Sequence, residues 1–290
     1  MAELLLKEKI MSQELFCYQN GKILPASQLC ISPWDLGFLR GYGVFDVLIS
    51  LNGKPFLWEW HFERLEHSAL ELGLVLPVDR NQYHAILQEV IGRNVGQDII
   101  VRTVVTGGVS QDAFTREKGQ ETFLVLAEPL VPLPQTVYTA GAKVMTLPHI
   151  RRLPKVKLTQ YVEAIRTLDQ RQEAGALETL YVQDGIISEC AQSNFFIVKD
   201  GTIITTTDNA LGGITQKLLC EVLIPELGLP LQTRTITYQE VLEADEAFLT
   251  GSNKHIVPVV RADDAVISDG KPGPLTRRLM EQYWEHQKRF

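Results

Sequence analysis

Two lysines precede an apolar-periodic run near the middle of the chain. Lys155 and Lys157 lie in RRLPKVKLTQYVEAI, residues 151–165. Most lysines at such a place are solvated charges, because lysine is almost never fully buried without a partner. A lysine amine can also bond to a carbonyl compound and act in catalysis. The rest of the sequence has to decide between these two interpretations.

A carboxylate interrupts a stretch that otherwise suits a buried strand. Glu189 lies in IISECAQSNFFIV, residues 186–198, and Asn194 lies in the same stretch before two phenylalanines. A glutamate here either faces solvent or is buried against a cation, because an unpaired buried charge is too unfavourable. Asn194 poses the same choice.

Two turns of small residues could bind an anion. In LGGIT, residues 211–215, two glycines leave the N–H groups of Ile214 and Thr215 open at the start of a predicted helix, whose dipole favours a phosphate. The alternative is an ordinary glycine turn with Thr215 as the helix cap. TGSN, residues 250–253, is a second turn of this kind. Neither motif is decisive alone.

Three arginines need partners or solvent. Arg102 lies on an apolar strand face in IIVRTVV, where it requires an anion from the protein or from a ligand. Arg40 lies among glycines and aromatic residues in LGFLRGYGVFD. The alternative to a ligand is pairing with Asp35, Asp46 or a distant carboxylate. Arg64 lies off the apolar stripe of a predicted helix, a position typical of the surface.

Competing motifs are absent from the sequence. There is no GxGxxG after a strand, no phosphate-binding GxxxxGK[ST] and no GxSxG nucleophile elbow. His61 and His67 are spaced wrongly for two zinc ligands on one helix face, and the scattered cysteines form no CxxC pair. No metal site is predicted.

The remaining residues together describe the needs of one cofactor, pyridoxal 5′-phosphate. A reactive lysine would form a Schiff base with its aldehyde, and a buried carboxylate would keep its pyridine nitrogen protonated, so that the ring acts as an electron sink. A helix N-terminus and an arginine would bind its phosphate.

On these motifs the sequence resembles the class IV aminotransferases, the fold-type IV pyridoxal phosphate enzymes. The resemblance extends over nearly the whole chain, with five motifs in the family's order. PKVKLTQY resembles the family's lysine segment and implies a covalent aldimine of the cofactor on Lys157, with Lys155 as a solvated neighbour. DGIISECAQSNFF resembles the most specific signature, which implies that Glu189 partners the pyridine nitrogen. Asn194 is expected at the cofactor too.

The other three motifs imply the phosphate contacts. HFERL resembles the segment whose arginine grips the phosphate, which is Arg64 here. LGGIT resembles the family's phosphate cup, with Leu211 against the ring and Ile214 and Thr215 at the phosphate. TGSN resembles the second phosphate loop, with Ser252 as a donor.

The resemblance implies a ping-pong transamination between an amino acid and a 2-oxo acid. The freed amine of Lys157 would move a proton between the substrate Cα and C4′ of the cofactor, which requires a lower basicity than that of an ordinary lysine. It also implies a homodimer in which the partner's small domain completes each active site. Arg40 would act there.

The substrate is less sharply specified. Branched-chain enzymes usually carry Glu-Gly-Ile-Arg after the phenylalanine that corresponds to Phe45, where this chain has Asp-Val-Leu. Better-known D-amino acid enzymes carry a tyrosine at Phe45 and an arginine in the turn where this chain has VTGGVS. Arg40 and Arg102 could hold the substrate carboxylate instead. With Phe45 and Asn253 as further substrate contacts, we favour a D-amino acid, such as D-alanine or D-glutamate, and 2-oxoglutarate.

Several alternatives remain. They are a branched-chain L-amino acid aminotransferase, an (R)-amine transaminase, an aminodeoxychorismate lyase, and a protein that binds the cofactor without turnover. Tyr161 is one residue too close to the lysine for the tyrosine of branched-chain relatives, so we expect it to begin a helical stripe.

The first half of the chain predicts hairpins, two helices and two buried strands. CYQNGKIL and LISLNGKPFLW place Asn-Gly between alternating apolar residues, the pattern of tight hairpins. Helical spacing follows in residues 61–73 and 81–94, and buried strands are expected at 98–107 and 121–128. Three prolines within EPLVPLPQ then predict an extended linker.

The second half predicts a mixed α/β domain. Asp184-Gly185 and Asp200-Gly201 predict an antiparallel meander, preceded by a helix that ends near Gly175. A helix after LGGIT, a strand–turn–strand at 245–260 and a final amphipathic helix with Pro274 in its first turn complete it. The predicted fold is α+β (mixed α/β), the two-domain architecture of fold-type IV. A small N-terminal domain would span residues 1–130, the linker 131–137, and a large cofactor-binding domain 138–290.

Composition excludes some classes of function. The chain of 290 residues is 45% hydrophobic and 22% charged, which is ordinary globular composition. A net charge of −7 argues against a nucleic acid partner. No apolar run approaches a membrane span and the N-terminus lacks a signal peptide's apolar region, so no membrane partner is expected. Cysteines without a pairing pattern favour a reducing compartment, and we expect the cytoplasm.

Overall fold

The computed structural model describes residues 14–94 and 98–290, which form two units. The first unit runs to Val131 and also includes Val156–Gln160, and the second contains Pro132–Lys155 and Tyr161–Phe290. The change of unit at Val131 falls inside the expected linker. Only part of that linker is extended, because residues from Gln135 onward form a helix. Residues 156–160, which the sequence-based division placed in the C-terminal domain, belong to the first unit by their contacts.

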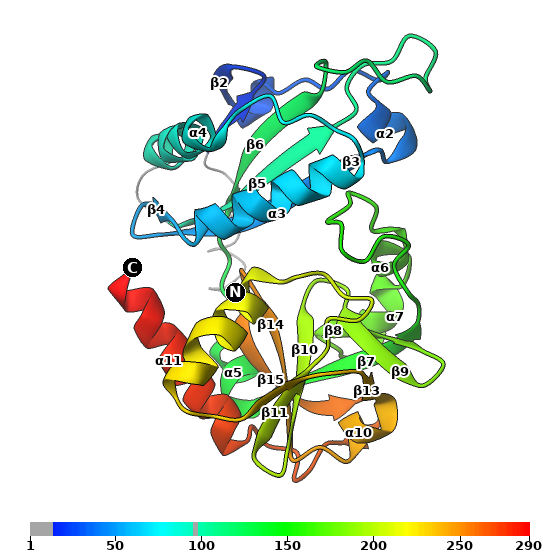
Figure 1. The fold of residues 1–290 in the computed structure, drawn as a ribbon, viewed down its shortest axis with the longest axis vertical. Coiled ribbons are helices and arrows are strands. Elements are labelled where there is room, and N and C mark those ends of the chain that lie inside the picture. Colours follow the sequence, from blue (N-terminus) through cyan, green and yellow to red (C-terminus); the bar gives the residue numbers. More distant parts are fainter. Residues whose placement is uncertain (1–13, 95–97) are drawn as a thin grey trace. The chain divides into compact units, whose positions relative to one another are not determined.

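The first unit contains a six-stranded sheet in the order β2-β1-β6-β5-β3-β4. The helices α3 and α4 pack with it around one apolar core (Figure 1). The elements of this unit are β1 Phe16–Gln19, β2 Lys22–Pro25, a 3₁₀ turn Ala26–Gln28, α2 Leu36–Arg40, β3 Gly43–Leu51, β4 Lys54–Pro55, α3 Trp58–Glu71, α4 Arg80–Arg93, β5 Ile99–Thr106 and β6 Thr122–Pro129.

Both Asn-Gly hairpins of the first unit are confirmed. Asn20 and Gly21 have φ of 43° and 93° between β1 and β2, and Asn52 and Gly53 have φ of 51° and 75° between β3 and β4. Two successive positive φ values define the turn whose twist matches that of the strands, and Asn-Gly reaches it at low steric cost. Both expected helices and both buried strands of this half also form.

The second unit is built on a ten-stranded sheet, in the order β12-β11-β10-β14-β15-β7-β8-β9-β13, with β16 paired to β15. Its elements are α5 Gln135–Ala140, β7 Ala142–Pro148, α6 Val162–Arg166, α7 Leu168–Glu173, β8 Glu178–Gln183, β9 Ile186–Cys190, β10 Asn194–Lys199, β11 Thr202–Thr205, α8 Ile214–Leu218, a π-helical turn Leu219–Leu223, α9 Ile224–Glu226, β12 Leu231–Thr233, β13 Ile236–Thr237, α10 Tyr238–Leu242, β14 Glu246–Gly251, β15 His255–Ala262, β16 Ala265–Val266 and α11 Pro274–Arg289.

The predicted meander is wrong in its order, although both of its hairpins form. The pairs β8–β9 and β10–β11 are antiparallel, but β14, β15 and β7 lie between them in the sheet. A tight turn joins the end of β9 to the start of β10, and in it the Cys190 N–H donates to the Ser193 carbonyl at 2.7 Å. Sequence spacing identified the two hairpins and could not reveal the distant strands that lie between them in the sheet.

The stripe expected after the lysines also differs from the prediction. The helix is broken at Thr167 into α6 and α7, and neither piece buries a residue. Val162 is 67% and Ile165 70% exposed. The helical periodicity therefore predicted the helices correctly, but the prediction that their apolar face is buried was wrong.

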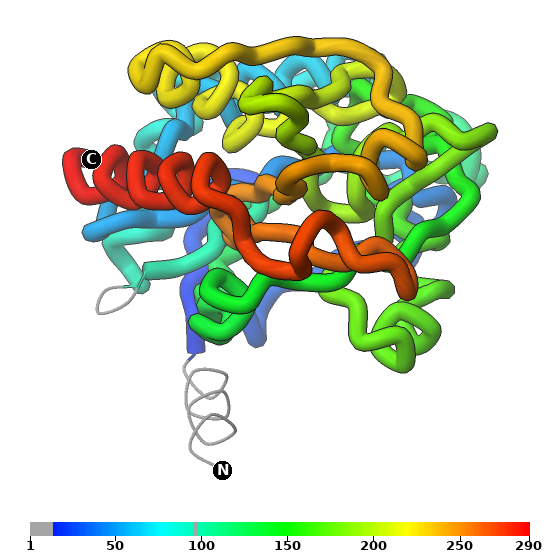
Figure 2. The backbone as a smooth tube through the Cα atoms, turned by 90° about the horizontal axis from the view of Figure 1, so that it is seen from below, coloured from blue at the N-terminus to red at the C-terminus, as the bar shows by residue number. Residues whose placement is uncertain are grey.

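The remaining predictions for this half are confirmed. A continuous helical stretch follows LGGIT, through α8, the π-helical turn and α9. The strands β14 and β15 form the expected strand–turn–strand. The helix α11, red in Figure 2, begins with Pro274 and buries Leu279 and Tyr283. Within the described residues, no helix combines the length and apolarity that crossing a bilayer requires.

His255 predicts how acid affects the stability of the second unit. It begins β15 with φ of 63°, and its ring lies 5.5 Å from that of Tyr283. Burial lowers the pKa of His255 to about 4. The unfolded chain binds this proton near its ordinary pKa of about 6.5, so stability is full above that pH and falls as the pH drops toward 4.

We expect His255→Asn to remove most of this acid sensitivity, because asparagine tolerates the left-handed backbone and does not titrate. The difference of about two and a half pKa units between 6.5 and about 4 corresponds to at most about 3.4 kcal/mol. Urea unfolding at pH 7 and pH 4.5 measures it, with the exposed His67→Asn as the control. A wild-type pH dependence in His255→Asn would contradict the assignment.

Candidate active site

The segment that contains Lys157, residues 156–160, is hydrogen-bonded to the edge of β3 that faces away from β5. The Phe45 N–H donates to the Lys157 carbonyl at 2.9 Å, and the Thr159 N–H donates to the Gly43 carbonyl at 3.0 Å. The Lys157 N–H donates to the Ser68 hydroxyl of α3 at 3.2 Å. Hydrogen bonds from its backbone to a strand and to a helix therefore fix the position from which the side chain of Lys157 extends. These bonds also explain why residues 156–160 belong to the first unit.

The neighbouring lysine has a different setting. Lys155 is exposed and its ammonium donates to the Thr207 carbonyl. The two lysines, two positions apart, belong to different units. Tyr161 is the N-cap residue that directly precedes α6.

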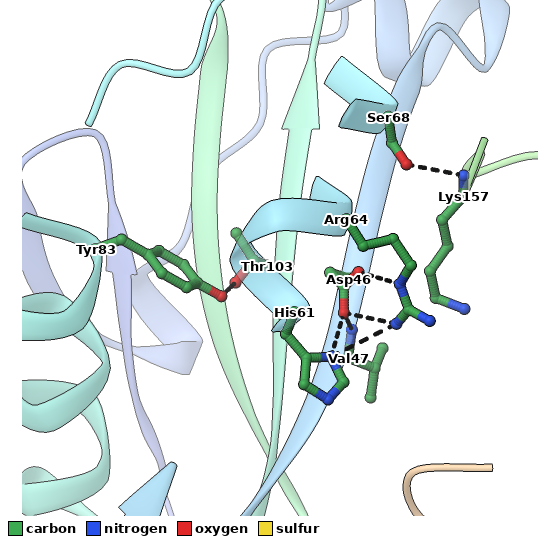
Figure 3. A network of polar contacts seen from close by, with 8 residues as sticks. All are labelled: Asp46, Val47, His61, Arg64, Ser68, Tyr83, Thr103 and Lys157. Carbon is green, nitrogen blue, oxygen red and sulfur yellow. Dashed lines mark hydrogen bonds and ion pairs between the residues drawn. The ribbon is translucent and has the colours of Figure 1, made fainter. Parts of the chain in front are cut away.

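A buried acid organises the charges beside the lysine segment (Figure 3). Arg64 makes a two-armed ion pair with Asp46, with Nε at 2.8 Å from Oδ2 and Nη2 at 2.9 Å from Oδ1. His61, one helical turn before Arg64 on α3, lies with Nδ1 at 2.6 Å from Asp46 Oδ1. The side chain of Lys157 lies alongside Arg64 in the same view.

The protonation states in this cluster follow from its charges. Burial raises the pKa of the Asp46 carboxyl, but Arg64 and His61 outweigh burial and hold that pKa far below its ordinary value. Burial lowers the pKa of His61, and the charges of Arg64 and Lys157 add to this, although Asp46 opposes it. The cluster therefore holds an ionised Asp46, a cationic Arg64 and a neutral imidazole.

The places of Asp46 and His61 beside Arg64 were not predicted from the sequence. Asp46 was considered only as a partner for another arginine, and His61 only as a zinc ligand. The available signal was helical spacing: His61 and Arg64 are three residues apart, so both face the same side of α3. Arg64 itself is not the surface residue that its position off the apolar stripe suggested, because its side chain is 11% exposed.

Phe45 lies between two cations. Its ring centroid is 4.7 Å from Lys157 Nζ and 5.4 Å from Arg102 Cζ. Arg102 also forms a two-armed pair with Glu128, whose second bond joins Nη2 and Oε2 at 3.0 Å. The partner that the sequence required for Arg102 is thus a distant carboxylate of the protein. Such stacking holds a cation over a ring without neutralising it.

Arg40 is differently placed. It ends α2, is exposed, and donates from Nη1 to the Leu39 carbonyl at 3.0 Å. Asp35, the partner considered for it, is engaged elsewhere: it caps α2 and accepts bonds from Thr106 and Thr122. Arg40 makes no ion pair with any residue in the described part of the chain.

In the second unit, Glu189 is the buried carboxylate of an ion pair with Arg151. It is 5% exposed, accepts from Arg151 Nε at 2.6 Å through Oε1, and accepts from the Leu211 N–H at 3.0 Å through Oε2. The choice left open by the sequence is thus decided: Glu189 is buried against a cation. Arg151 was not singled out from the sequence, although it lies in the quoted lysine segment.

Asn194 links this carboxylate to the LGGIT turn. Its Nδ2 donates to the Leu211 carbonyl at 2.8 Å, and a Cβ at Gly213 would lie 1.8 Å from Asn194 Oδ1. Glycine is therefore required at that position. Gly213 is the N-cap of α8 and no side chain caps the helix, whereas a Cβ on Gly212 would meet nothing within 4 Å.

The TGSN turn joins β14 to β15 and has half-buried Ser252 and Asn253 at its tip. The Lys254 N–H closes the turn on the Gly251 carbonyl at 3.1 Å. Thr215 lies in the first turn of α8 and hydrogen-bonds with Tyr283. The second unit thus brings together Glu189, Asn194 and the LGGIT turn.

These residues fit pyridoxal phosphate by their chemistry. Within the first unit, the side chains of Lys157 and Arg64 lie side by side, which offers an amine for an aldehyde and a guanidinium for a phosphate. Taken by itself, the second unit has a buried carboxylate, open backbone N–H groups at an uncapped helix start, and space at Gly212. Among the described residues, no group of three or more His, Cys, Asp or Glu side chains is placed to hold a metal ion.

Comparisons with known proteins agree with this chemistry. The family model for class IV aminotransferases matches residues 43–262. A putative branched-chain-amino-acid aminotransferase of Methanocaldococcus jannaschii is 30% identical over 276 residues, which is 92% of this chain and 94% of the relative. A D-alanine aminotransferase of Listeria monocytogenes is 29% identical over 272 residues, again 92% and 94% of the two chains.

Solved structures share the fold. The branched-chain amino acid aminotransferase of Escherichia coli superposes with a TM-score of 0.87 at 22% identity, covering 94% of each chain. That of Thermoproteus uzoniensis, solved with norvaline, gives a TM-score of 0.84 at 23% identity, covering 95% of each chain. The predicted α+β fold of the fold-type IV enzymes is thereby confirmed. The chain belongs to the class IV aminotransferases, and it is a pyridoxal phosphate-dependent aminotransferase.

Proposed function

We propose that the protein transfers the amino group of a D-amino acid, such as D-alanine or D-glutamate, to a 2-oxo acid such as 2-oxoglutarate, in a ping-pong sequence. Pyridoxal phosphate, when bound, supplies an aldehyde for the amine and a ring that withdraws electrons from the reacting carbon. The protein supplies the amine that holds the cofactor, its anchors and the substrate contacts.

Lys157 is the proposed catalytic residue. Its Nζ would hold the cofactor covalently, and once released by the incoming amino group it would take the proton from the substrate Cα and deliver it to the carbon of the cofactor that had carried the aldehyde. Its support is geometric: the backbone at Lys157 is bonded to β3 and α3, and the ring of Phe45 lies against the amine.

The proposed anchors of the cofactor divide between its two ends. Glu189 would face the pyridine nitrogen with Asn194 beside it, and Leu211 would lie against the ring. The phosphate would be bound by the backbone and hydroxyl donors of Ile214, Thr215 and Ser252, and by Arg64. Glu189 already forms an ion pair with a cation, Arg151, which supports its role beside a protonated nitrogen.

The observation that carries the D-amino acid assignment is the exposure and the pairing of two arginines, Arg40 and Arg102. Arg40 is exposed and has no ion pair within the described residues, so its guanidinium can receive a carboxylate. Arg102 is stacked on Phe45 and paired with Glu128, and would help by holding Phe45 in place. Asn253 is a further proposed substrate contact. D-alanine aminotransferases among the relatives give independent support.

A branched-chain L-amino acid aminotransferase is the second candidate. It is favoured by the name of the Methanocaldococcus jannaschii relative. Under either activity we propose a homodimer with shared active sites, because the family resemblance places Arg40 at the partner's site. The cytoplasm remains the proposed compartment, on the cysteine pattern of the sequence.

The first prediction from this proposal concerns the half-reaction. Holoenzyme mixed separately with D-alanine, D-glutamate or L-leucine, without an acceptor, should lose the visible absorbance of its bound cofactor with the D-amino acids alone. Bleaching by L-leucine alone would establish the branched-chain activity instead. Lys157→Ala should bleach with none of them, because it lacks the proton-transferring amine.

Arg40→Ala should lower kcat/KM for D-alanine by roughly 10-fold to 100-fold, the value of about 1.5–3 kcal/mol for a charged hydrogen bond. Arg40→Lys should recover only part of this, because an ammonium lacks the planar fork that grips a carboxylate. The matched control is Arg93→Ala, which removes an exposed arginine from α4. Equal activity in Arg40→Ala and Arg93→Ala would exclude the carboxylate role.

The Asp46 cluster predicts a stability effect as well. Arg64 can bind a phosphate only while Asp46 keeps its guanidinium oriented, and Asp46→Asn leaves that cation without its buried anion. We expect a loss of about 3–5 kcal/mol in the free energy of unfolding by urea. Asp264→Asn, which breaks the exposed pair with Lys143, should lose less than about 1 kcal/mol. Similar losses in the two variants would mean that the Asp46 pair is not fixed in solution.

A further inference from the structure

A buried lysine–carboxylate pair lies in the second unit, in addition to the Arg151–Glu189 pair. Lys254 is 8% and Glu178 0% exposed, and the Lys254 ammonium donates to Glu178 Oε1. It also donates to Gln192 Oε1 at 2.9 Å, and the Ser193 hydroxyl donates to Glu178 Oε1 at 3.0 Å. Glu178 Oε2 is buried and finds no hydrogen-bond partner among the described residues.

The pair connects strand β8, which begins at Glu178, with the turn that carries two of the proposed cofactor contacts. Lys254 follows Ser252 and Asn253 directly, and its carbonyl accepts from the Tyr138 hydroxyl at 3.1 Å. The side chain of Lys254 thus reaches from the TGSN turn to Glu178 at the start of β8 and to residue 192, while the backbone of Lys254 closes the turn itself.

Further hydrogen-bond partners of the pair lie in the turn between Glu189 and Asn194. Gln192 and Ser193 occupy this turn, which the Cys190 N–H closes on the Ser193 carbonyl at 2.7 Å. The Ala191 N–H donates to the Thr179 carbonyl at 2.9 Å, one residue after Glu178. The single oxygen Glu178 Oε1 is therefore bonded from both turns at once.

A need for stability does not explain such a pair. Two charges lose their hydration on burial, and apolar residues of similar volume commonly serve a core as well or better. An orphan carboxylate oxygen adds to that penalty. What an ion pair provides and apolar contact does not is a fixed distance and direction between the two chain segments.

We propose that Lys254 and Glu178 are positioning residues for the cofactor. This inference rests on the proposed function. The pair holds the Ser252–Asn253 turn at a fixed place relative to Glu189 and Asn194, so that the sites for the phosphate and for the pyridine nitrogen keep the spacing of one rigid molecule.

The test replaces both charges together, Lys254→Met with Glu178→Leu, which avoids leaving either ion unpaired in the core. Pyridoxal phosphate affinity is measured by equilibrium titration, and the setting of the bound cofactor by its visible circular dichroism. We expect a Tm close to that of the wild type, with Kd raised at least about tenfold, or 1.4 kcal/mol. The dichroism per bound cofactor should change too.

Two controls separate positioning from stability. Val241→Ala empties a buried site on α10 of the same unit and should lower Tm without changing Kd. Gln192→Ala removes an exposed partner and leaves both charges paired, so it folds even where the double variant does not. We expect Gln192→Ala to raise Kd by about threefold, which corresponds to part of the free energy that one charged hydrogen bond contributes.

Each outcome bears on a different claim. Wild-type Kd and dichroism in the double variant would overturn the positioning role. Should the double variant not fold, an unchanged Kd in Gln192→Ala would overturn it. A wild-type protein that binds no pyridoxal phosphate would overturn the proposed function and this inference with it.

Discussion

Backbone hydrogen bonds on the edge of β3 are the constraint on which the site depends. They bring residues 157–159 back to the first unit after the chain has already entered the second, and they fix the amine of Lys157 beside Phe45 and α3. The side chains that surround the amine come from the same strand and helix. A strand edge is rigid, so the position of the amine depends little on the loops that lead to it.

Three buried carboxylates of the molecule are each paired with a cation. Asp46, Glu178 and Glu189 are all nearly inaccessible to solvent, and each is matched by a cation: Arg64, Lys254 and Arg151 respectively. A buried carboxylate without such a partner would take up a proton and lose its function as an anion. The three pairs therefore keep one negative charge in the interior of the first unit and two in the interior of the second.

The sequence predicted what is local and missed what is assembled through space. Asn20-Gly21 and Asp184-Gly185 identified their turns, because positive φ at two successive positions restricts the residue types. The motif around Glu189 was found because a carboxylate in an apolar strand is conspicuous. Arg151 was missed because it is separated from Glu189 by 38 residues, and Lys254 because its carboxylate is 76 residues away. The exposure of Val162 and Ile165 could not be predicted either, since periodicity defines a face and not what covers it.

The return of residues 156–160 to the first unit has a consequence for dividing this chain. The polypeptide passes between the units at Val131, before Val156 and after Gln160. A fragment that stops at the first crossing lacks residues 156–160, which bond to the edge of β3, and the complementary fragment carries these residues without the strand they bond to. The units are thus not autonomous modules that a single cut could separate, and two such halves could regain activity only by complementation, with residues 156–160 of one fragment bonding to β3 of the other.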